Sequence, residues 1–384
     1  MDNNPIGVGE SLVPKSSNFL KSLGITHQDI ITHCNGTLKL GIVFDGFNRP
    51  GECFSFPFGI GESKQYNASS IDRIIDTSRI PQNMFDYPDI ATHFRTTEMA
   101  DYLDTRVGEF TNLKIVREVA TKEGLEGTYD LLIDSTGFGR HVSFMPDNFE
   151  DVKHIIPNNQ AFTTRVKYTD LSTQFKPYSL FKAMEYGWCW HIPLQDTLVF
   201  GYVHDNKFDV TNEFVQHVNG YMGVEIAPAN INTIKFTTGR NKIHLKNNVA
   251  AIGLASAFIE PLESTGIYLI IASIEKLAQY IEGAMTEDEY NYQANEAFDS
   301  IVNFIAAHYK YSARSNEYWN HYKTLDIQQY KETDIFPKEA WNYLLSGFDL
   351  GIPKPTDATD PRELINIYKG TPYYNWIQDA SNFT

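Results

Sequence analysis

Residues 249–282 read VAAIGLASAFIEPLESTGIYLIIASIEKLAQYIE, and the rest of the chain is organised around them. The stretch begins with an apolar run typical of a β-strand, passes through Gly253, Pro261 and Gly266, and continues as an apolar helix pattern. The polar residues at the predicted helix start are Glu260, Glu263, Ser264 and Thr265. Because the first N–H groups of a helix lack partners within it, this start could hold a halide, phosphate or carboxylate. An ordinary strand, loop and helix with a Ser or Thr cap explains the pattern equally well.

Composition limits the class of protein. A chain of 384 residues with 42% hydrophobic and 14% aromatic residues can bury a large core in one large domain or two lobes. The 32 basic and 48 acidic residues give a net charge of −16, which argues against nucleic acid or an anionic membrane as the main partner.

Location and metal binding follow from simple features of the chain. Three cysteines without CxxC spacing predict reduced thiols in the cytoplasm and no metal site. The first ten residues lack a secretory signal pattern, and the longest apolar run is too short to span a bilayer. We therefore expect a cytoplasmic protein without a membrane partner.

Glycines near the N-terminus resemble part of a dinucleotide-binding fingerprint. Gly7, Val8 and Gly9 match its beginning, but Leu12 stands where the third glycine belongs and no strand pattern precedes them. An intact nucleotide-binding turn is therefore not predicted here. Further along, residues 37–44 alternate like a strand, which predicts that the side chain of Lys39 points to solvent.

Two later segments suggest a ligand site. Residues 53–61 (CFSFPFGIG) are typical of an ordered loop lining an apolar pocket, and core packing is equally compatible. Residues 129–134 predict a buried strand that leads into a small, glycine-rich turn at 135–140. This turn fits either the edge of a cofactor site or a plain chain reversal.

The remaining pattern predicts a β-rich body with a helical C-terminal part, which is a mixed α/β fold. Antiparallel strands are expected across residues 160–204, with the last two joined at 195–196. Further strands are expected at 113–116 and 233–238, and a turn at 239–240. Helices are expected at 18–23, from 26, and at 96–108, 211–219, 337–345 and 361–368. Thr286 and Glu289 predict a capping box at the start of another helix.

Two motifs in the correct order then become specific. Residues 188–193 (WCWHIP) match the W-x-W-x-I-P string of flavin-dependent halogenases, and residues 258–266 (FIEPLESTG) are similar to their F-x-E-P-L-E-S-T-G segment. Weaker similarity is present at 6–14, at 34–39 (CNGTLK) and at 134–138 (DSTGF). The chain resembles the tryptophan halogenase family over most of its length.

The resemblance implies an FAD-dependent monooxygenase-like fold and a halogenase. Such an enzyme uses reduced FAD (FADH2), O2 and a halide ion to make hypohalous acid. The acid then travels to an electron-rich, small-molecule aromatic substrate. A separate flavin reductase is implied as a partner, and a homo-oligomer is possible.

The resemblance also assigns roles to residues. Lys39 and Glu263 match the catalytic pair: the lysine holds the oxidant, while the glutamate orients it or takes the proton from the ring intermediate. Thr265 and Gly266 match the halide site, and Glu260 is expected to be structural. The expected cofactor contacts are Gly7, Val8, Gly9, Glu10, Asp134, Gly137 and Ile267. The expected partition between flavin and substrate consists of Trp188, Trp190, Ile192 and Pro193. The expected substrate pocket consists of Phe56, Pro57, Phe58 and Ser264.

Two departures from the family pattern affect what we expect of cofactor binding and of the substrate. The family's N-terminal strand and GxGxxG turn are expected to be missing, and Phe56 stands where tryptophan-specific members carry a histidine. The substrate is therefore expected not to be tryptophan. We expect a halogenase domain at 1–324 and a helical extension over the substrate side at 325–384. The alternatives are a flavin monooxygenase that hydroxylates an aromatic substrate, and an inactive, truncated flavoprotein-like binding protein.

Overall fold

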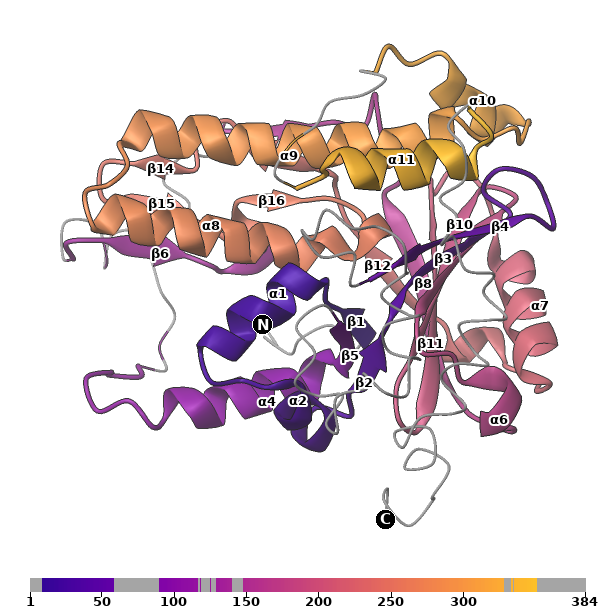
Figure 1. Ribbon diagram of the computed structural model, residues 1–384, viewed down its shortest axis with the longest axis horizontal. Helices are drawn as coiled ribbons and strands as arrows, with labels where there is room; N and C mark the ends of the chain where they lie inside the picture. The colour runs from indigo at the N-terminus through magenta and orange to yellow at the C-terminus, as the bar shows by residue number, and fades with distance from the viewer. Residues whose placement is uncertain are drawn as a thin grey trace, which may run out of the picture.

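The structure is a computed structural model that describes residues 9–58, 90–116, 118, 125, 129–139, 148–327, 333 and 335–350. Four β-sheets and a set of helices form the described part of the chain. Figure 1 shows a group of N-terminal helices and short strands beside a large sheet, with two long helices running side by side above them.

The largest sheet has seven strands in the order β12-β8-β11-β10-β9-β3-β4. Its pairs are antiparallel except for β3 and β9, which are parallel. The strands are β3 (Gly41–Asp45), β4 (Cys53–Pro57), β8 (Gln160–Lys167), β9 (Ser179–Met184), β10 (Gly187–Pro193), β11 (Thr197–His204) and β12 (Asn232–Lys235).

Three small sheets flank this large one. The first contains β1 (Gly9–Ser11), β5 (Ala91–Arg95) and β2 (Thr37–Lys39) in that order. The second contains β16 (Ala257–Phe258), β13 (Gly239–Asn241) and β7 (Phe149–Asp151). The third contains β14 (Leu245–Lys246), β15 (Val249–Ala251) and β6 (Leu132–Asp134), and its β15–β6 pair is parallel.

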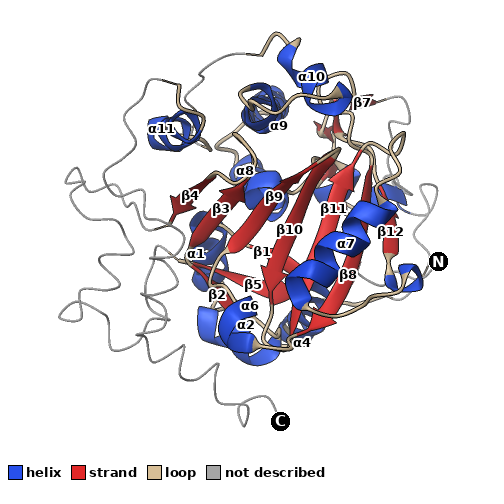
Figure 2. Cartoon of the chain, turned by 90° about the vertical axis from the view of Figure 1, so that its right-hand side faces the viewer, coloured by secondary structure: helices blue, strands red, loops and turns tan. Residues whose placement is uncertain are grey.

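The helices surround the sheets. They are α1 (Pro14–Ser22), α2 (His27–His33), α4 (Thr96–Val107), α6 (Leu171–Gln174), α7 (Thr211–Met222), α8 (Thr265–Ile281), α9 (Glu287–Lys310), α10 (Glu317–Lys323) and α11 (Lys338–Gly347). Helix α9 begins with the predicted capping box between Thr286 and Glu289. Figure 2 shows α7 in front of the large sheet and α9, α10 and α11 above the upper ends of its strands.

Strand β10 contributes side chains to both faces of the large sheet, because successive side chains of a strand point to opposite sides. Trp188, Trp190 and Ile192 join the main core, which lies between the sheet and helices α9 to α11. Cys189 joins a second core, which packs under α7. Gly201 on the neighbouring strand makes room for one indole, since a Cβ there would lie 1.8 Å from a ring atom of Trp190. The WxWxIP string therefore forms a fully buried strand in the centre of the sheet.

Much of the secondary structure agrees with the sequence prediction. The mixed α/β class is confirmed, as are the antiparallel strands in 160–204 and the helix at 96–107. Other helices differ only at their ends: 14–22 in place of 18–23, 211–222 in place of 211–219, and 338–347 in place of 337–345. The strand predicted at 233–238 is β12, and the helix predicted at 361–368 lies outside the described residues.

Five predictions about β-structure are wrong. Residues 37–44 form two strands in different sheets, and residues 113–116 form no strand. Residues 239–241 form β13 where a turn was expected. The strand expected at 129–134 begins at 132, and it is not fully buried because Ile133 is 44% exposed. Residues 53–57, expected to be a loop, form edge strand β4, where alternating aromatics pair with β3.

None of the helices in the described part of the chain combines the length and apolar character that crossing a bilayer requires. The three cysteines are free thiols: Cys34 and Cys189 are buried, and Cys53 is exposed.

Candidate functional site

The start of α8 has an unusual backbone. Glu263 and Ser264 both adopt positive φ angles, of 70° and 57°. For residues with a side chain this conformation costs about 1–2 kcal/mol each, and such strain is concentrated at functional sites. Ser264 is the N-cap residue, but its side chain makes no cap hydrogen bond. The turn therefore directs two polar side chains away from the helix and leaves its first N–H groups open.

Lys39 receives one of these side chains. Its ammonium donates to Ser264 Oγ at 2.8 Å, to the backbone oxygen of Leu12 at 3.0 Å and to Ser11 Oγ at 3.3 Å. The two serine hydroxyls are also 2.7 Å apart. All three N–H groups of the ammonium therefore have partners, from β1, the residue after it, and the start of α8.

The prediction that Lys39 points to solvent is wrong, because its side chain is 0% exposed. The chain changes sheets at Leu40: β2 pairs with β5, whereas β3 pairs with β4 and β9. Both faces of β2 are consequently covered, so alternation does not place any of its residues in water.

Burial changes the charge balance around this lysine. Desolvation lowers the pKa of the Lys39 ammonium to about 7, although the carboxylates of Glu263 and Glu10 act in the opposite direction. Desolvation also raises the pKa of the Glu10 carboxyl to about 7, against the attraction of Lys39. A lysine that titrates near neutrality can donate a hydrogen bond or act as a nucleophilic amine.

Glu263 is near enough to Lys39 to affect its pKa, but its hydrogen bond goes elsewhere. Its Oε1 lies 2.7 Å from Nε2 of His308, and both side chains are buried. His308 lies on α9 and was not selected from the sequence. The sequence gives one weak indication that His308 is buried: it is a polar residue within the apolar run Ile305–Tyr309.

Glu260 behaves as expected of a structural residue. Its side chain is fully buried and accepts hydrogen bonds from Asn158 at 2.7 Å, from the indole N–H of Trp188 at 3.2 Å and from the Tyr309 hydroxyl. Desolvation raises the pKa of its carboxyl to about 7, and these hydrogen bonds oppose that change. Tyr318 also donates to Asn158, so the network links α10 to the same loop.

A mostly apolar cavity of about 360 Å³ lies at the start of α8. Its wall includes Gly266 and Ile267 from the helix, Trp190 from β10, Glu10 from β1 and Phe138. A Cβ on Gly266 would meet no atom within 4 Å, so this glycine keeps the cavity open at the first helical turn. Thr265, directly before it, is buried.

Lys39 lies next to the cavity. Lys39 and Ser264 are not among the described residues that line it, whereas Glu10, Trp190 and Gly266 are. The structure thus brings the predicted catalytic lysine close to the predicted halide residues, because Lys39 donates to Ser264, the residue directly before Thr265.

Other predicted residues lie around this centre. Gly9 lies against β10, because a Cβ on this glycine would be 3.0 Å from the side chain of Ile192. Pro193 accepts a hydrogen bond at its backbone oxygen from the hydroxyl of Thr37. Asp134 is buried at the end of β6: its Oδ1 accepts from Thr136, whereas its Oδ2 has no partner among the described residues. Gly137 follows with a φ of 74°. Gly7 and Val8 lie outside the described residues.

The predicted substrate residues differ in their surroundings. The ring of Phe58 is half-buried, and the Lys39 ammonium lies 5.1 Å from its centroid. Phe56 is instead packed into the core, with its ring 5.8 Å from that of Tyr343. The side chain of Pro57 lies outside the described residues.

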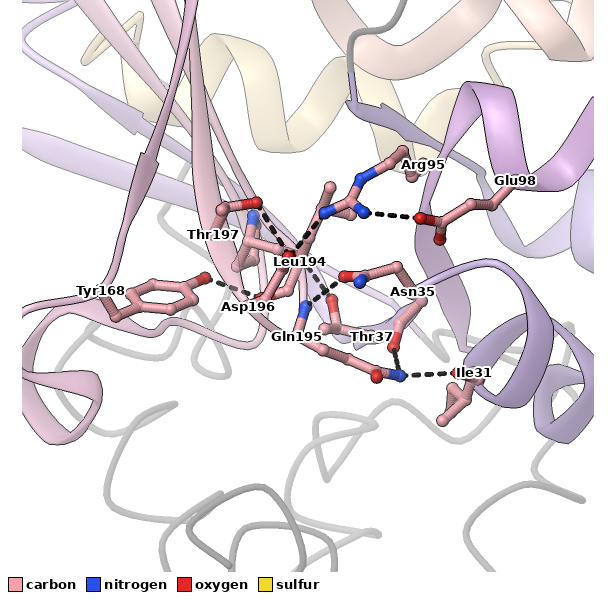
Figure 3. A network of polar contacts seen from close by, with 12 residues as sticks. Ile31, Asn35, Thr37, Arg95, Glu98, Tyr168, Leu194, Gln195, Asp196 and Thr197 are labelled. Atoms are coloured by element: carbon pink, nitrogen blue, oxygen red, sulfur yellow. Dashed lines mark hydrogen bonds and ion pairs between the residues drawn. The ribbon is translucent and has the colours of Figure 1, made fainter. Parts of the chain in front are cut away.

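A polar network holds the small N-terminal sheet against the β10–β11 turn (Figure 3). The side chain of Gln195 donates to the backbone oxygens of Ile31 and Gly36, and its backbone N–H donates to Asn35. Arg95 pairs with Asp196 at 2.6 Å. Because β2 and β10 are tied together here, Lys39 keeps a defined position relative to the tryptophan strand.

Cys189, His191 and His217 are the described residues grouped closely enough to hold a metal ion. The two histidines, however, already bond to each other through Nε2 atoms 2.7 Å apart. Lys182 is also near enough to act on both rings, which disfavours a cation. The cluster lies on the face under α7, away from Lys39.

Comparisons with known proteins show the family of this chain. The family model "Tryptophan halogenase" matches residues 2–79 and 90–343. Tryptophan 6-halogenase ThaL of Streptomyces albogriseolus is 27% identical over 98% of this chain and 79% of that enzyme. Tryptophan 7-halogenase RebH of Lentzea aerocolonigenes is 25% identical over 96% and 81%.

The fold is also found in solved structures. Xcc4156, a flavin-dependent halogenase from Xanthomonas campestris, aligns with a TM-score of 0.75 at 21% identity, over 97% of this chain and 87% of that one. Since the family model covers most of the sequence and the same fold recurs, the chain belongs to the tryptophan halogenase family.

Proposed function

We propose that this chain is an FADH2-dependent halogenase that uses O2 and a halide to make hypohalous acid and halogenate an electron-rich aromatic small molecule. The observation that carries the proposal is Lys39, a fully buried lysine held by Ser264 at the wall between an apolar cavity and the ring of Phe58. The reduced flavin comes from a separate reductase.

The residues around the cavity suit a flavin and a halide. The space left by Gly266 and the uncapped start of α8 offer N–H groups to an anion. The orphan Oδ2 of Asp134, which is 1% exposed, can accept a hydrogen bond from a ligand hydroxyl group. When bound, FADH2 would supply the reaction of O2 with halide, and Thr265 and Gly266 would hold the halide.

The proposed role of the two tryptophans follows from their burial. Trp188 and Trp190 fill the space between the sheet and the α8 segment, and the hydrogen bond from Trp188 to Glu260 fixes the first ring. Such a wall keeps an aromatic substrate away from the flavin while a small oxidant reaches Lys39. For Lys39 to hold the oxidant facing the substrate, one of its three hydrogen bonds gives way to the oxidant, or its neutral amine offers the lone pair.

Phe58 is proposed to form a stacking wall of the substrate site. Its ring is half-buried beside the lysine, and aromatic rings stack with centroids 4.5–7 Å apart. Phe56 occupies the position of the histidine found in tryptophan-specific members. On this basis the proposed substrate is an aromatic compound other than free tryptophan.

The test is an assay of the full chain with FAD, a flavin reductase, NADH, and chloride, bromide or iodide. A panel of phenols, indoles, pyrroles and free tryptophan serves as substrates, and mass spectrometry reads the products. A halogenated product from a compound other than tryptophan is expected. A gain of one oxygen in place of halogen would favour the hydroxylating monooxygenase. Protein that stays colourless with FAD and yields no product would favour the inactive binding protein.

A further inference from the structure

The two ring nitrogens of His308 have different partners. Nδ1 lies 2.9 Å from the backbone oxygen of Phe304, one turn earlier on α9, and Nε2 lies 2.7 Å from Oε1 of Glu263. A backbone oxygen can only accept a hydrogen bond, so Nδ1 must carry a hydrogen. The hydrogen-bond pattern therefore determines one of the two protonation sites of the ring.

The contact with Glu263 then requires a second proton. A neutral imidazole with hydrogen on Nδ1 has a bare Nε2, and an ionised carboxylate has only acceptors. Two bare acceptors 2.7 Å apart would repel each other. One proton must lie between them, so the pair is either imidazolium with carboxylate or imidazole with carboxylic acid.

The surroundings favour the charged form of the pair. His308 is fully buried, and phenyl rings surround it: the centroid of Phe44 is 4.9 Å away, that of Phe304 5.2 Å, and those of Phe47 and Phe56 just over 6 Å. The aromatic rings attract an imidazolium, and this attraction opposes the cost of burying its charge in such a dry site.

Charged groups on neighbouring elements act in the same direction. Lys39 from β2 is near enough to Glu263 to interact with its charge, and Glu260 from the loop before α8 interacts with His308. The ammonium of Lys39 attracts the carboxylate of Glu263, and the carboxylate of Glu260 attracts the ring of His308 when that ring is charged. Oε2 of Glu263 has no hydrogen-bond partner among the described residues, so it is left to receive a proton.

We propose that His308 is a positioning residue that keeps Glu263 ionised and oriented, so that Glu263 acts as the base which removes the ring proton. This inference rests on the proposed halogenase function. After the electrophilic halogen has added to the ring, the C–H bond at that carbon breaks and its electron pair restores aromaticity. The proton goes to Oε2 of Glu263, the imidazolium keeps its own proton, and the neutral acid later releases its proton to solvent.

The first experiment measures halogenation against pH for the wild type, His308→Gln and His308→Phe. Without the imidazolium, Glu263 loses the hydrogen-bond donor that holds its carboxylate in place. We expect His308→Phe to lose about 10²-fold in turnover at neutral pH and to recover as the pH rises. His308→Gln keeps a donor to Glu263 and should lose less. Flavin reoxidation and hypohalite trapped by a small scavenger should be unchanged in both, since these steps precede proton removal.

A control variant tests whether His308 has a structural role alone. His204 is also buried, bonds to Gln160 and lies on the α7 side of the sheet. His204→Gln should keep the wild-type pH profile at any stability it reaches. Titration of Lys39 contributes to every profile, including that of His204→Gln. A His308→Phe profile with the shape of the wild type would overturn the proposal, as would a joint loss of product and hypohalite.

A second experiment does not depend on activity. In protein carrying ¹⁵N-labelled histidine, the His308 signal should show both nitrogens protonated at neutral pH. In Glu263→Gln it should revert to a neutral ring with hydrogen on Nδ1. A neutral His308 ring in the wild type would overturn the ion pair even if halogenation occurs. If no substrate is halogenated but the signal is as expected, the proposed function fails while the ion pair stands.

Discussion

Glu260 and Glu263 lie three residues apart, yet the structure gives them opposite surroundings. Three hydrogen-bond donors surround Glu260, and its cluster joins the loop before α8 to the sheet and to α9. Glu263 has one hydrogen-bond partner among the described residues, His308, and a strained backbone at the start of α8. A buried carboxylate with all its partners stabilises the fold, whereas one with an open oxygen next to a buried lysine can exchange protons.

The largest effect is expected for Lys39→Ala, which removes the amine proposed to hold the oxidant. Product formation should fall by about 10³-fold or more, because the oxidant is no longer held beside the substrate. Flavin reoxidation should remain, because Lys39 is not among the described residues that line the cavity proposed for the flavin. The measurement is product by mass spectrometry alongside flavin oxidation. Lys153→Ala, an exposed lysine, is the control, and product retained in Lys39→Ala would remove this lysine from the chemistry.

Glu260→Ala should affect stability. It leaves the donors of Asn158, Trp188 and Tyr309 unpaired in the core, so the free energy of unfolding should fall by about 3 kcal/mol or more. Urea denaturation followed by tryptophan fluorescence measures this loss. Glu263→Ala is the matched comparison and should lose less, because only His308 loses its partner. Equal losses would mean that the two carboxylates do not differ as the structure indicates.

The pH dependence of stability separates the lysine from the carboxylates. Lys39 has a pKa of about 7 in the folded protein, whereas the ordinary value for a lysine in an unfolded chain is 10.5, so between these values the unfolded state binds more protons. Stability should therefore rise with pH across this window, by up to about 1.4 kcal/mol per pH unit. Lys39→Met should lack this slope. Glu10 and Glu260, with raised pKa values of about 7, act at lower pH: their contribution falls as the pH rises from 4.5 to 7.

The smallest effect on stability is expected for Gly266→Ala. A methyl group there meets no neighbour, and alanine is the better helix former, so stability should change by less than about 1 kcal/mol and increase. The same methyl group enters the cavity next to the proposed halide, and the half-saturating halide concentration should rise about 10-fold. An unchanged halide dependence would place the anion elsewhere.

Sequence reasoning succeeded where a local pattern was enough. The capping box of Thr286 and Glu289 and the antiparallel strands within residues 160–204 depend on patterns of nearby residues, and both are present. It failed for Lys39, since alternation along one strand does not reveal that the chain changes sheets at Leu40. It also missed His308, because 45 residues separate it from Glu263 and no short motif joins them.

The sequence alone determined the family, the mixed α/β class and the two tryptophans of the WxWxIP string, because these depend on short motifs and periodicity. Only the tertiary structure decided that Lys39 is buried, that Ser264 holds it, and that Glu263 faces His308. These facts depend on contacts between β1, β2, α8 and α9, which are far apart in the chain. Burial and proton positions belong to the assembled environment, since desolvation and hydrogen-bond partners exist only after the chain has folded.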